Sequence, residues 1–242
     1  MKTNQQKDIK ILFIKKANDF FADKAAEFIL LHYPSATIVS GTRQQPFPKE
    51  LLSWKGDIII SYLAQWIIPT ALLAKAKMAA LNFHPGPPEY PGIGCTNFAI
   101  YDGADEFGVV CHHMVSKVDS GKIVAVKRFP VYDHDTVYSI TQRCYSEILN
   151  MFYEIFYLLM NGEEIPQSNE VWKRSPYLRK QLNELCRLTP GMDINEAERR
   201  IKATTYVHSW AFVQDGETII KLTEEDIKNK TYLTYLCRSK VS

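Results

Sequence analysis

Apolar and polar positions follow two alternating patterns over the first third of the chain. Short, almost wholly apolar runs have the length and composition of strands buried on both faces of a sheet. Between them, apolar residues recur at the spacing of a helix with one buried face. The predicted elements, in order, are strand 10–15, helix 19–33, strand 36–39, strand 57–61, helix 69–77 and strand 78–83. This alternation predicts an α/β fold of the Rossmann-like type: a mostly parallel sheet with helices on both faces.

The middle of the chain continues with a short helix, two runs rich in β-forming residues and one long helix. The short helix is expected over 95–101. The β-rich runs, 108–117 and 122–130, are joined by Val-Asp-Ser-Gly and predict a hairpin-like extension of the sheet. Asp135 and Thr136 are candidate caps for the long helix, which should end at Asn161-Gly162.

The last third of the chain has a different character and predicts a second, smaller unit. Residues 168–180 are polar and basic, and 193–203 form a charged helix candidate with Asn195 as a possible cap. A hairpin is expected where two apolar runs, 211–213 and 218–222, flank Asp215-Gly216. We therefore predict a first domain over 1–165 and a small C-terminal α+β subdomain over 166–242.

Composition and charge narrow the class of protein. Of the 242 residues, 46% are hydrophobic and 23% charged, as in ordinary globular proteins, and the net charge of +2 gives no reason to expect nucleic acid or a membrane as a partner. The five cysteines are widely spaced without a CxxC pair, which favours a reducing, cytoplasmic setting over a zinc site or disulfides.

No segment has the pattern of a signal peptide or a membrane span. The first ten residues are polar and lack an apolar core. The longest uncharged run, 58–74, contains Ser61, Gln65 and Pro69, whereas a spanning helix needs about 20 mostly apolar residues. A buried strand, a loop and a helix start account for it better.

The stretch after strand 78–83 is the strongest candidate for a functional site. Asn82 and His84 are two positions apart, so on a strand they point to the same face. The following loop, 85–94, is dense in proline and glycine, which predicts a stiff backbone that a ligand can approach closely. Open α/β sheets bind ligands at such strand ends. No GxGxxG motif follows the first strand, so an NAD enzyme is not indicated.

Three side chains are candidates for chemistry, each with a structural alternative. His84 can handle protons near neutral pH, or it can be a structural histidine of the loop. Asn82 can donate to a developing oxyanion, or it can simply end a strand. Asp119 can orient an imidazole and stabilise its cationic form, or it can be a turn residue, and spacing alone does not choose between the two.

Other candidates are weaker. His112 and His113 are adjacent on a predicted strand and face opposite ways, which disfavours a shared metal ion. Cys95 and Cys111 are predicted to pack rather than react. The aromatic residues at 206 and 210, near the basic residues 199–202, could stack a base and neutralise phosphates, or could pack at the end of a surface helix.

Two motifs together resemble a known family. Asn82-x-His84-Pro85 with the loop to Gly92, and the block from Val118 to Ile123, resemble the signature of the N10-formyltetrahydrofolate-dependent formyltransferases. The His-Pro-Gly-Pro-Pro-Glu-Tyr-Pro-Gly loop is similar to that of the nucleotide-linked amino-sugar N-formyltransferases, and so are the tail segments 177–185 and 198–206. The resemblance extends over nearly the whole chain and departs from the family pattern at 208–210.

The resemblance implies a formyltransferase-type fold and a role for each candidate residue. Asn82, His84 and Asp119 match the catalytic trio. The cosubstrate N10-formyltetrahydrofolate is expected at the loop after the third strand, and no metal is needed. The cofactor-binding residues implied are Leu63, Gln65, Trp66, Ile67, Ile68, Val118 and Lys122. The substrate-binding residues implied are Pro85, Gly86, Pro87, Tyr90, Gly92, Cys95, Asn97, Arg179, Lys202, Tyr206 and Trp210.

The expected activity is formyl transfer to the amine of a dTDP-linked amino-dideoxy sugar, with dTDP-4-amino-4,6-dideoxyglucose as the predicted substrate, for O-antigen and lipopolysaccharide synthesis. The resemblance also implies a homodimer and a C-terminal subdomain for the sugar nucleotide or dimerisation. The alternatives are a methionyl-tRNA or purine-type formyltransferase and a non-catalytic folate- or nucleotide-binding module. The modest net charge argues against tRNA.

Overall fold

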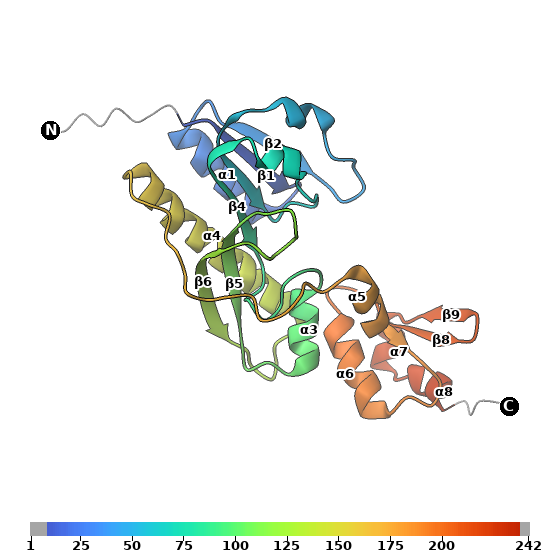
Figure 1. Ribbon diagram of the computed structural model, residues 1–242. Helices are drawn as coiled ribbons and strands as arrows, with labels where there is room; N and C mark the ends of the chain where they lie inside the picture. Colours follow the sequence, from blue (N-terminus) through green and yellow to red (C-terminus); the bar gives the residue numbers. More distant parts are fainter. Residues whose placement is uncertain (1–8, 238–242) are drawn as a thin grey trace. The chain divides into compact units, whose positions relative to one another are not determined.

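The computed structural model describes residues 9–237, and its ribbon is drawn in Figure 1. The first eight residues lie outside the described part. The expectation about a signal peptide rests mostly on these residues. Within 9–237, none of the helices is both long enough and apolar enough to cross a membrane.

The principal sheet has six strands in the order β2-β1-β3-β4-β5-β6. The first four strands are parallel, whereas β5 runs antiparallel to β4. At the two ends of the β5–β6 pair, the His113 amide donates to the Lys122 carbonyl and the Val131 amide to that of Asp105. The mostly parallel sheet and its hairpin-like extension are therefore confirmed. The strands are β1 (Ile11–Lys16), β2 (Thr37–Gly41), β3 (Gly56–Tyr62), β4 (Ala76–His84), β5 (Glu106–His113) and β6 (Ile123–Pro130).

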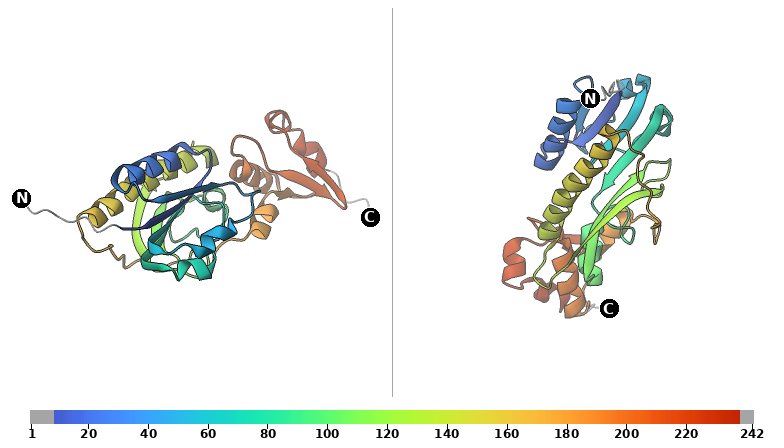
Figure 2. Two further views of the ribbon diagram at one scale, coloured as in Figure 1. Left: turned by 90° about the horizontal axis from the view of Figure 1, so that it is seen from above. Right: turned by 90° about the vertical axis from the view of Figure 1, so that its left-hand side faces the viewer.

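Helices cover both faces of the parallel part of the sheet, as Figure 2 shows from above. On one face, the rings of Phe13, Tyr62 and Phe83 all lie within 6 Å, centroid to centroid, of Phe152 on α4 (Val137–Met160). Phe28 of α1 (Phe20–His32) adds a further ring to this aromatic core. Because side chains alternate along a strand, Leu12, Ile14 and Ile59 point the other way. They pack against η1 (Lys49–Ser53) and α2 (Thr70–Leu73).

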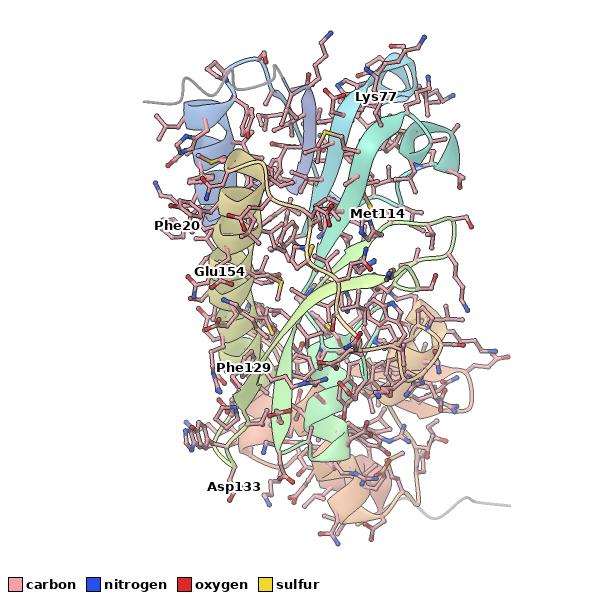
Figure 3. The ribbon with its side chains drawn as sticks, turned by 60° about the vertical axis from the view of Figure 1, so that its left-hand side comes forward. Phe20, Lys77, Met114, Phe129, Asp133 and Glu154 are labelled. Carbon is pink, nitrogen blue, oxygen red and sulfur yellow. The ribbon has the colours of Figure 1, made fainter. Side chains whose placement is uncertain are left out.

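Three predicted element ends are wrong, each for a local reason. The helix expected over 69–77 is only α2, because pairing with Gly56 already draws Ala76 into β4. β5 ends at His113 rather than 117, where the amide of Met114 turns to the Ala80 carbonyl at 2.7 Å, beside β4 in Figure 3. Asp193, not Asn195, caps α6 (Ile194–Thr204) by accepting from the Glu196 amide.

The contacts divide the chain into two units. Of the described residues, the first unit contains 9–91, 108–128 and 144–175, and the second contains 92–107, 129–143 and 176–237. The C-terminal residues thus group with α3 (Cys95–Asp102) and with the start of α4. The domain boundary at 165/166 stays a prediction.

The second unit has its own sheet and core. Its strands are β7 (Arg187–Leu188), β8 (Phe212–Asp215) and β9 (Thr218–Lys221), and the predicted hairpin is β8–β9. Leu188, Val213 and Ile201 form part of a buried apolar cluster between this sheet and the helices around it. Three short helices of this unit were not predicted: α5 (Arg179–Leu185), α7 (Glu224–Lys228) and α8 (Tyr232–Leu236).

Candidate functional site

The carboxyl end of β4 carries Asn82 and His84 on one face of the strand. The parallel register pairs Ser61 with Asn82 and Tyr62 with Phe83. The loops that follow β3 and β4 therefore leave the sheet at the same edge. This edge is where an open α/β sheet places its ligands.

Asp119 is brought to this edge from the turn between β5 and β6. Its side chain is buried, with 5% of the residue exposed, and its Oδ2 lies 3.4 Å from Nδ1 of His84. The Nδ2 of Asn82 lies 3.5 Å from the other oxygen, Oδ1. The structure thus brings Asn82, His84 and Asp119 together although 37 positions separate the first from the last.

The turn that holds Asp119 is tight and conformationally unusual. Asp119 has a φ of 43°, in the left-handed region that residues with a side chain seldom adopt. Two residues later, a Cβ on Gly121 would lie 1.8 Å from the carbonyl oxygen of His113, so only glycine fits there. Backbone strain of this kind is typical of residues whose position serves a site.

A second histidine, His112, contacts the same carboxylate and was not assigned to the site from the sequence. It is 2% exposed, and its Nε2 lies 3.2 Å from Oδ1 of Asp119 and 3.1 Å from Nδ2 of Asn82. Its Nδ1 lies 2.9 Å from the carbonyl of His113. The β4–β5 register pairs Asn82 with His112. Knowledge of this antiparallel pairing would have pointed to His112, but the sequence alone does not specify it.

His84 has an oxygen near each ring nitrogen. Its Nδ1 faces Asp119, and its Nε2 lies 3.2 Å from the carbonyl oxygen of Tyr90, in the loop that follows β4. A neutral imidazole donates from one nitrogen only, whereas the imidazolium donates from both. Each ring nitrogen of His84 therefore faces an acceptor oxygen, one on the Asp119 carboxylate and one on the main chain.

The predicted folate residues lie on two loops. Leu63 follows β3 with a left-handed φ of 51°, Ile68 is buried, and Ile67 is 74% exposed. The Nε2 of Gln65 donates to the Leu63 carbonyl. Val118 and Lys122 are exposed on either side of the Asp119 turn, and Lys122 hydrogen-bonds Gln167.

Trp66 packs against other parts of the chain. Its indole occupies the space that a Cβ on Gly41 would need, and its Nε1 donates to the Gln45 carbonyl at 2.8 Å. These contacts account for Trp66 as a residue that orders the loop after β2. Its assignment to the folate site stays a prediction.

The predicted sugar-binding residues fall into both units. Pro85, Gly86, Pro87 and Tyr90 lie in the first unit, directly after β4. The others lie in the second unit: Gly92, Cys95, Asn97, Arg179, Lys202, Tyr206 and Trp210.

Within the second unit, several of these residues have structural contacts. Asn97 is buried on α3 and donates to the Ala203 carbonyl of α6 at 2.7 Å, and Gly92 pairs with Tyr177. Lys202 donates to the carbonyl of Asp133. Residues 206 and 210 lie beyond the end of α6 in a turn, and Trp210 is 47% exposed.

The hypothesis of a metal at His112 and His113 was disfavoured from the sequence. Across residues 9–237, no group of three or more His, Cys, Asp or Glu side chains is arranged to hold a metal ion.

A mostly parallel sheet with polar side chains gathered at its carboxyl edge defines an α/β ligand-binding fold of the Rossmann-like class. The chain belongs to the formyl transferase family, whose family model matches residues 4–154.

Relatives with similar sequences match only part of the chain. Methionyl-tRNA formyltransferase of Listeria monocytogenes is 33% identical over 88 residues, which cover 36% of this chain and 28% of that protein. The chain therefore matches less than a third of the length of that relative, and 46% of the length of the enzyme from Geobacillus thermodenitrificans.

Solved structures match over most of the chain. A sugar N-formyltransferase from a Shewanella species has a TM-score of 0.69 at 15% identity, covering 88% of this chain and 96% of its own. An N-formyltransferase from Helicobacter canadensis, in complex with folinic acid and dTDP-3-aminofucose, has a TM-score of 0.64 at 20% identity, covering 81% and 80%. At these identities the likeness shows the fold.

Proposed function

We propose that the protein transfers a formyl group from N10-formyltetrahydrofolate to the amine of a dTDP-linked amino-dideoxy sugar. The observation that carries this proposal is the convergence of Asn82, His84 and Asp119 at the carboxyl edge of the sheet. The family supplies the class of reaction. Two structural neighbours, covered over 96% and 80% of their length, are a sugar N-formyltransferase and an N-formyltransferase in complex with dTDP-3-aminofucose, which favours a sugar over tRNA as acceptor.

The reaction forms one C–N bond and breaks another. The sugar amine attacks the formyl carbon, the bond from that carbon to N10 of the folate breaks, and one proton moves from the amine to the departing nitrogen. Negative charge gathers on the formyl oxygen when the amine attacks. Preorganised donors at that oxygen are the largest contribution that such a site can make.

The three side chains take complementary roles. Asn82 donates its amide to the developing oxyanion. His84, held between Asp119 and the Tyr90 carbonyl, stabilises the same charge as imidazolium. Asp119 fixes the ring and relays the proton, and His112 holds the other oxygen of that carboxylate. The alternative role of His84 is to accept the amine proton.

The loop after β3 suits the folate. Its irregular backbone at Leu63 and its exposed apolar side chain at Ile67 present main-chain groups and apolar surface to a flat heteroaromatic ring. Because β3 and β4 are neighbours in register, this loop leaves the sheet beside Asn82 and His84. The acceptor we propose is dTDP-4-amino-4,6-dideoxyglucose, in O-antigen synthesis, with the protein acting as a homodimer.

The test is an acceptor panel analysed by mass spectrometry. Purified protein is incubated with N10-formyltetrahydrofolate and, separately, with 4-amino and 3-amino dTDP-sugars, their UDP counterparts, methionyl-tRNA and glycinamide ribonucleotide. The proposal expects a gain of one formyl group on one dTDP-sugar. Transfer to methionyl-tRNA or to glycinamide ribonucleotide would overturn the proposed sugar acceptor and identify the protein as a formyltransferase for that other acceptor. If no acceptor is formylated, the alternative of a non-catalytic folate- or nucleotide-binding module would be supported.

A variant separates catalysis from folding. His84→Asn should leave the circular dichroism spectrum unchanged and abolish transfer, because an amide of this size cannot carry the charge of the imidazolium. A rate near that of the wild type would rule out His84 as the group that stabilises the oxyanion.

A further inference from the structure

One more aromatic ring lies against the imidazoles of the candidate site. The indole of Trp172 meets the ring of His112 edge to face, with centroids 5.1 Å apart and planes at 87°. It also meets the ring of His84 at 6.1 Å and 73°. Edge-to-face contacts at these distances are favourable and fix the relative orientation of the rings.

Trp172 also holds the turn that carries Asp119. Its Nε1 donates to the carbonyl oxygen of Gly121 at 2.8 Å, two residues after Asp119. The left-handed φ of Asp119 makes this turn one that its surroundings must stabilise. One indole therefore contacts both histidines and, through Gly121, the turn that supplies their shared carboxylate.

The segment around Trp172 is hydrogen-bonded to the loop that follows β4 and to the start of β6. The amide of Lys173 donates to the carbonyl of Pro88, in the loop that follows His84, at 3.0 Å. The amide of Ser168 donates to the carbonyl of Ile123 at 3.1 Å. Arg128 pairs with both Glu89 and Glu170. We call residues 167–173 the strap.

We propose that Trp172 is a positioning residue, which holds His84, His112 and the Asp119 turn in the geometry that formyl transfer requires. This inference rests on the proposed function. Trp172 acts on the orientation of the imidazoles rather than on either substrate. A misplacement of about 1 Å in a catalytic group can cost a hundredfold in rate, so loss of the indole should lower kcat more than it changes KM.

The kinetic test compares two substitutions of Trp172 with a matched tryptophan elsewhere. Trp172→Leu removes both the aromatic edge and the N–H donor and should lower kcat about tenfold or more, with KM for the folate and the sugar within about twofold. Trp172→Phe keeps an aromatic edge and should retain an intermediate kcat. Trp54→Leu, on the residue that follows η1 at the amino end of β3, away from the carboxyl edge that carries the site, should leave kcat unchanged.

A second readout does not depend on activity. His84 and His112 are 5% and 2% exposed, so diethylpyrocarbonate should modify them slowly in the wild type. In Trp172→Leu, peptide mass mapping should show faster modification of both, while His208, whose side chain is 80% exposed, reacts at the same rate in every variant. If Trp172→Leu does not fold by circular dichroism, Trp172→Phe decides through its kcat.

The outcomes separate this inference from the proposed function. If kcat of Trp172→Leu stays within about twofold of wild type while His84→Asn is inactive, the positioning role is overturned and the function stands. If the wild type transfers no formyl group, the proposed function fails. In that event the modification test still applies. If His84 and His112 react with diethylpyrocarbonate at the same rate in Trp172→Leu as in the wild type, the placement of Trp172 against the two rings is overturned as well.

Discussion

Asp119 is the residue through which the polar side chains of the site are connected. One of its oxygens faces His84 and the other faces His112, and the amide of Asn82 lies near the second. A carboxylate that contacts one ring with each of its oxygens restricts both rings. The precision of the site therefore depends on a turn residue that adopts a backbone conformation most side chains avoid.

At this scale the amide of Asn82 has the most direct predicted effect on rate. Asn82→Ala removes one preorganised donor to the oxyanion, which is worth about 3 kcal/mol of barrier, so kcat should fall about a hundredfold or more. Steady-state kinetics with the acceptor found in the panel measure the loss. Asn161→Ala, on an exposed residue at the end of α4, is the control and should match the wild type. A loss below about threefold would contradict the role of Asn82.

Tyr62 is a residue-scale case in which a polar group opposes stability. Its hydroxyl is buried in the aromatic core and, among buried side-chain atoms of residues 9–237, lacks a hydrogen-bond partner. Tyr62→Phe should leave the free energy of unfolding unchanged or raise it by about 1 kcal/mol. Tyr62→Ala should lower it by about 3–5 kcal/mol, because it opens a cavity. Urea denaturation compares the two, and a clear destabilisation by Tyr62→Phe would mean that the hydroxyl is satisfied.

The same tyrosine gives the stability a dependence on alkaline pH. Burial, with smaller contributions from Asp19 and Tyr153, raises the pKa of Tyr62 above its ordinary value of 10.0. The unfolded chain then loses the phenolic proton at lower pH than the folded protein. Wild type should lose stability as the pH rises through about 10, and Tyr62→Phe should lose less. Equal losses in urea titrations at about pH 8 and 10.5 would contradict this.

At the scale of elements, the start of α4 shows how a helix end is fixed. Thr136 accepts from the Ser139 amide through its hydroxyl, and the Ser139 hydroxyl accepts from the Thr136 amide. Asp135, 3% exposed, accepts from the Tyr132 amide, the Ser139 hydroxyl and the side chain of Arg143. The sequence-based expectation of caps at 135–136 agrees with these bonds.

Asp135 should therefore contribute to stability above acidic pH. Burial alone would raise its pKa, but the hydrogen bonds from Arg143, Tyr132 and Ser139 outweigh burial and hold the pKa below 3.8. A depressed pKa gives stability that is present above about pH 4 and is lost as the pH falls through the folded-state value. Asp135→Asn should cost about 1.5–3 kcal/mol at pH 7 and progressively less in acid.

The neighbouring aspartate provides the control for that measurement. Asp133→Asn, on an exposed side chain two positions away, should change the free energy of unfolding by less than about 0.5 kcal/mol. Urea denaturation at pH 7 and at about pH 3 compares the variants. An equal loss for Asp135→Asn at both values would show that its carboxylate does not act through its charge.

Strands that are buried on both faces were predictable, and the shortest helices were not. β1 and β3 each contain a continuous apolar run, 11–14 and 58–60, because both of their faces pack against helices. The helix α2 has only four residues, and the apolar residues that follow it belong to β4. α7 has five residues and a Thr223–Asp226 capping box, a local signal too short to be distinguished from a turn.

At the scale of the whole molecule, the same limit applies to the candidate site. Asn82 and His84 lie two residues apart on one strand, so the sequence alone predicts that their side chains point to the same face. His112 could not be placed, because its contact with Asn82 depends on the antiparallel pairing of β4 with β5, across 30 positions. Trp172 reaches the rings from the strap, a polar segment without regular structure, which no periodic pattern marks.

The stability of the whole protein should report folate binding before any acceptor is known. A ligand that binds only the folded chain, at about 100 times its Kd, adds about 2.7 kcal/mol, which in a chain of this size raises Tm by about 5–10 °C. Folinic acid is the probe, and differential scanning fluorimetry measures the shift. Thiamine at the same concentration is the control and should leave Tm unchanged. An unchanged Tm over a folinic acid titration into the millimolar range would contradict the folate site, whichever amine the protein acts on.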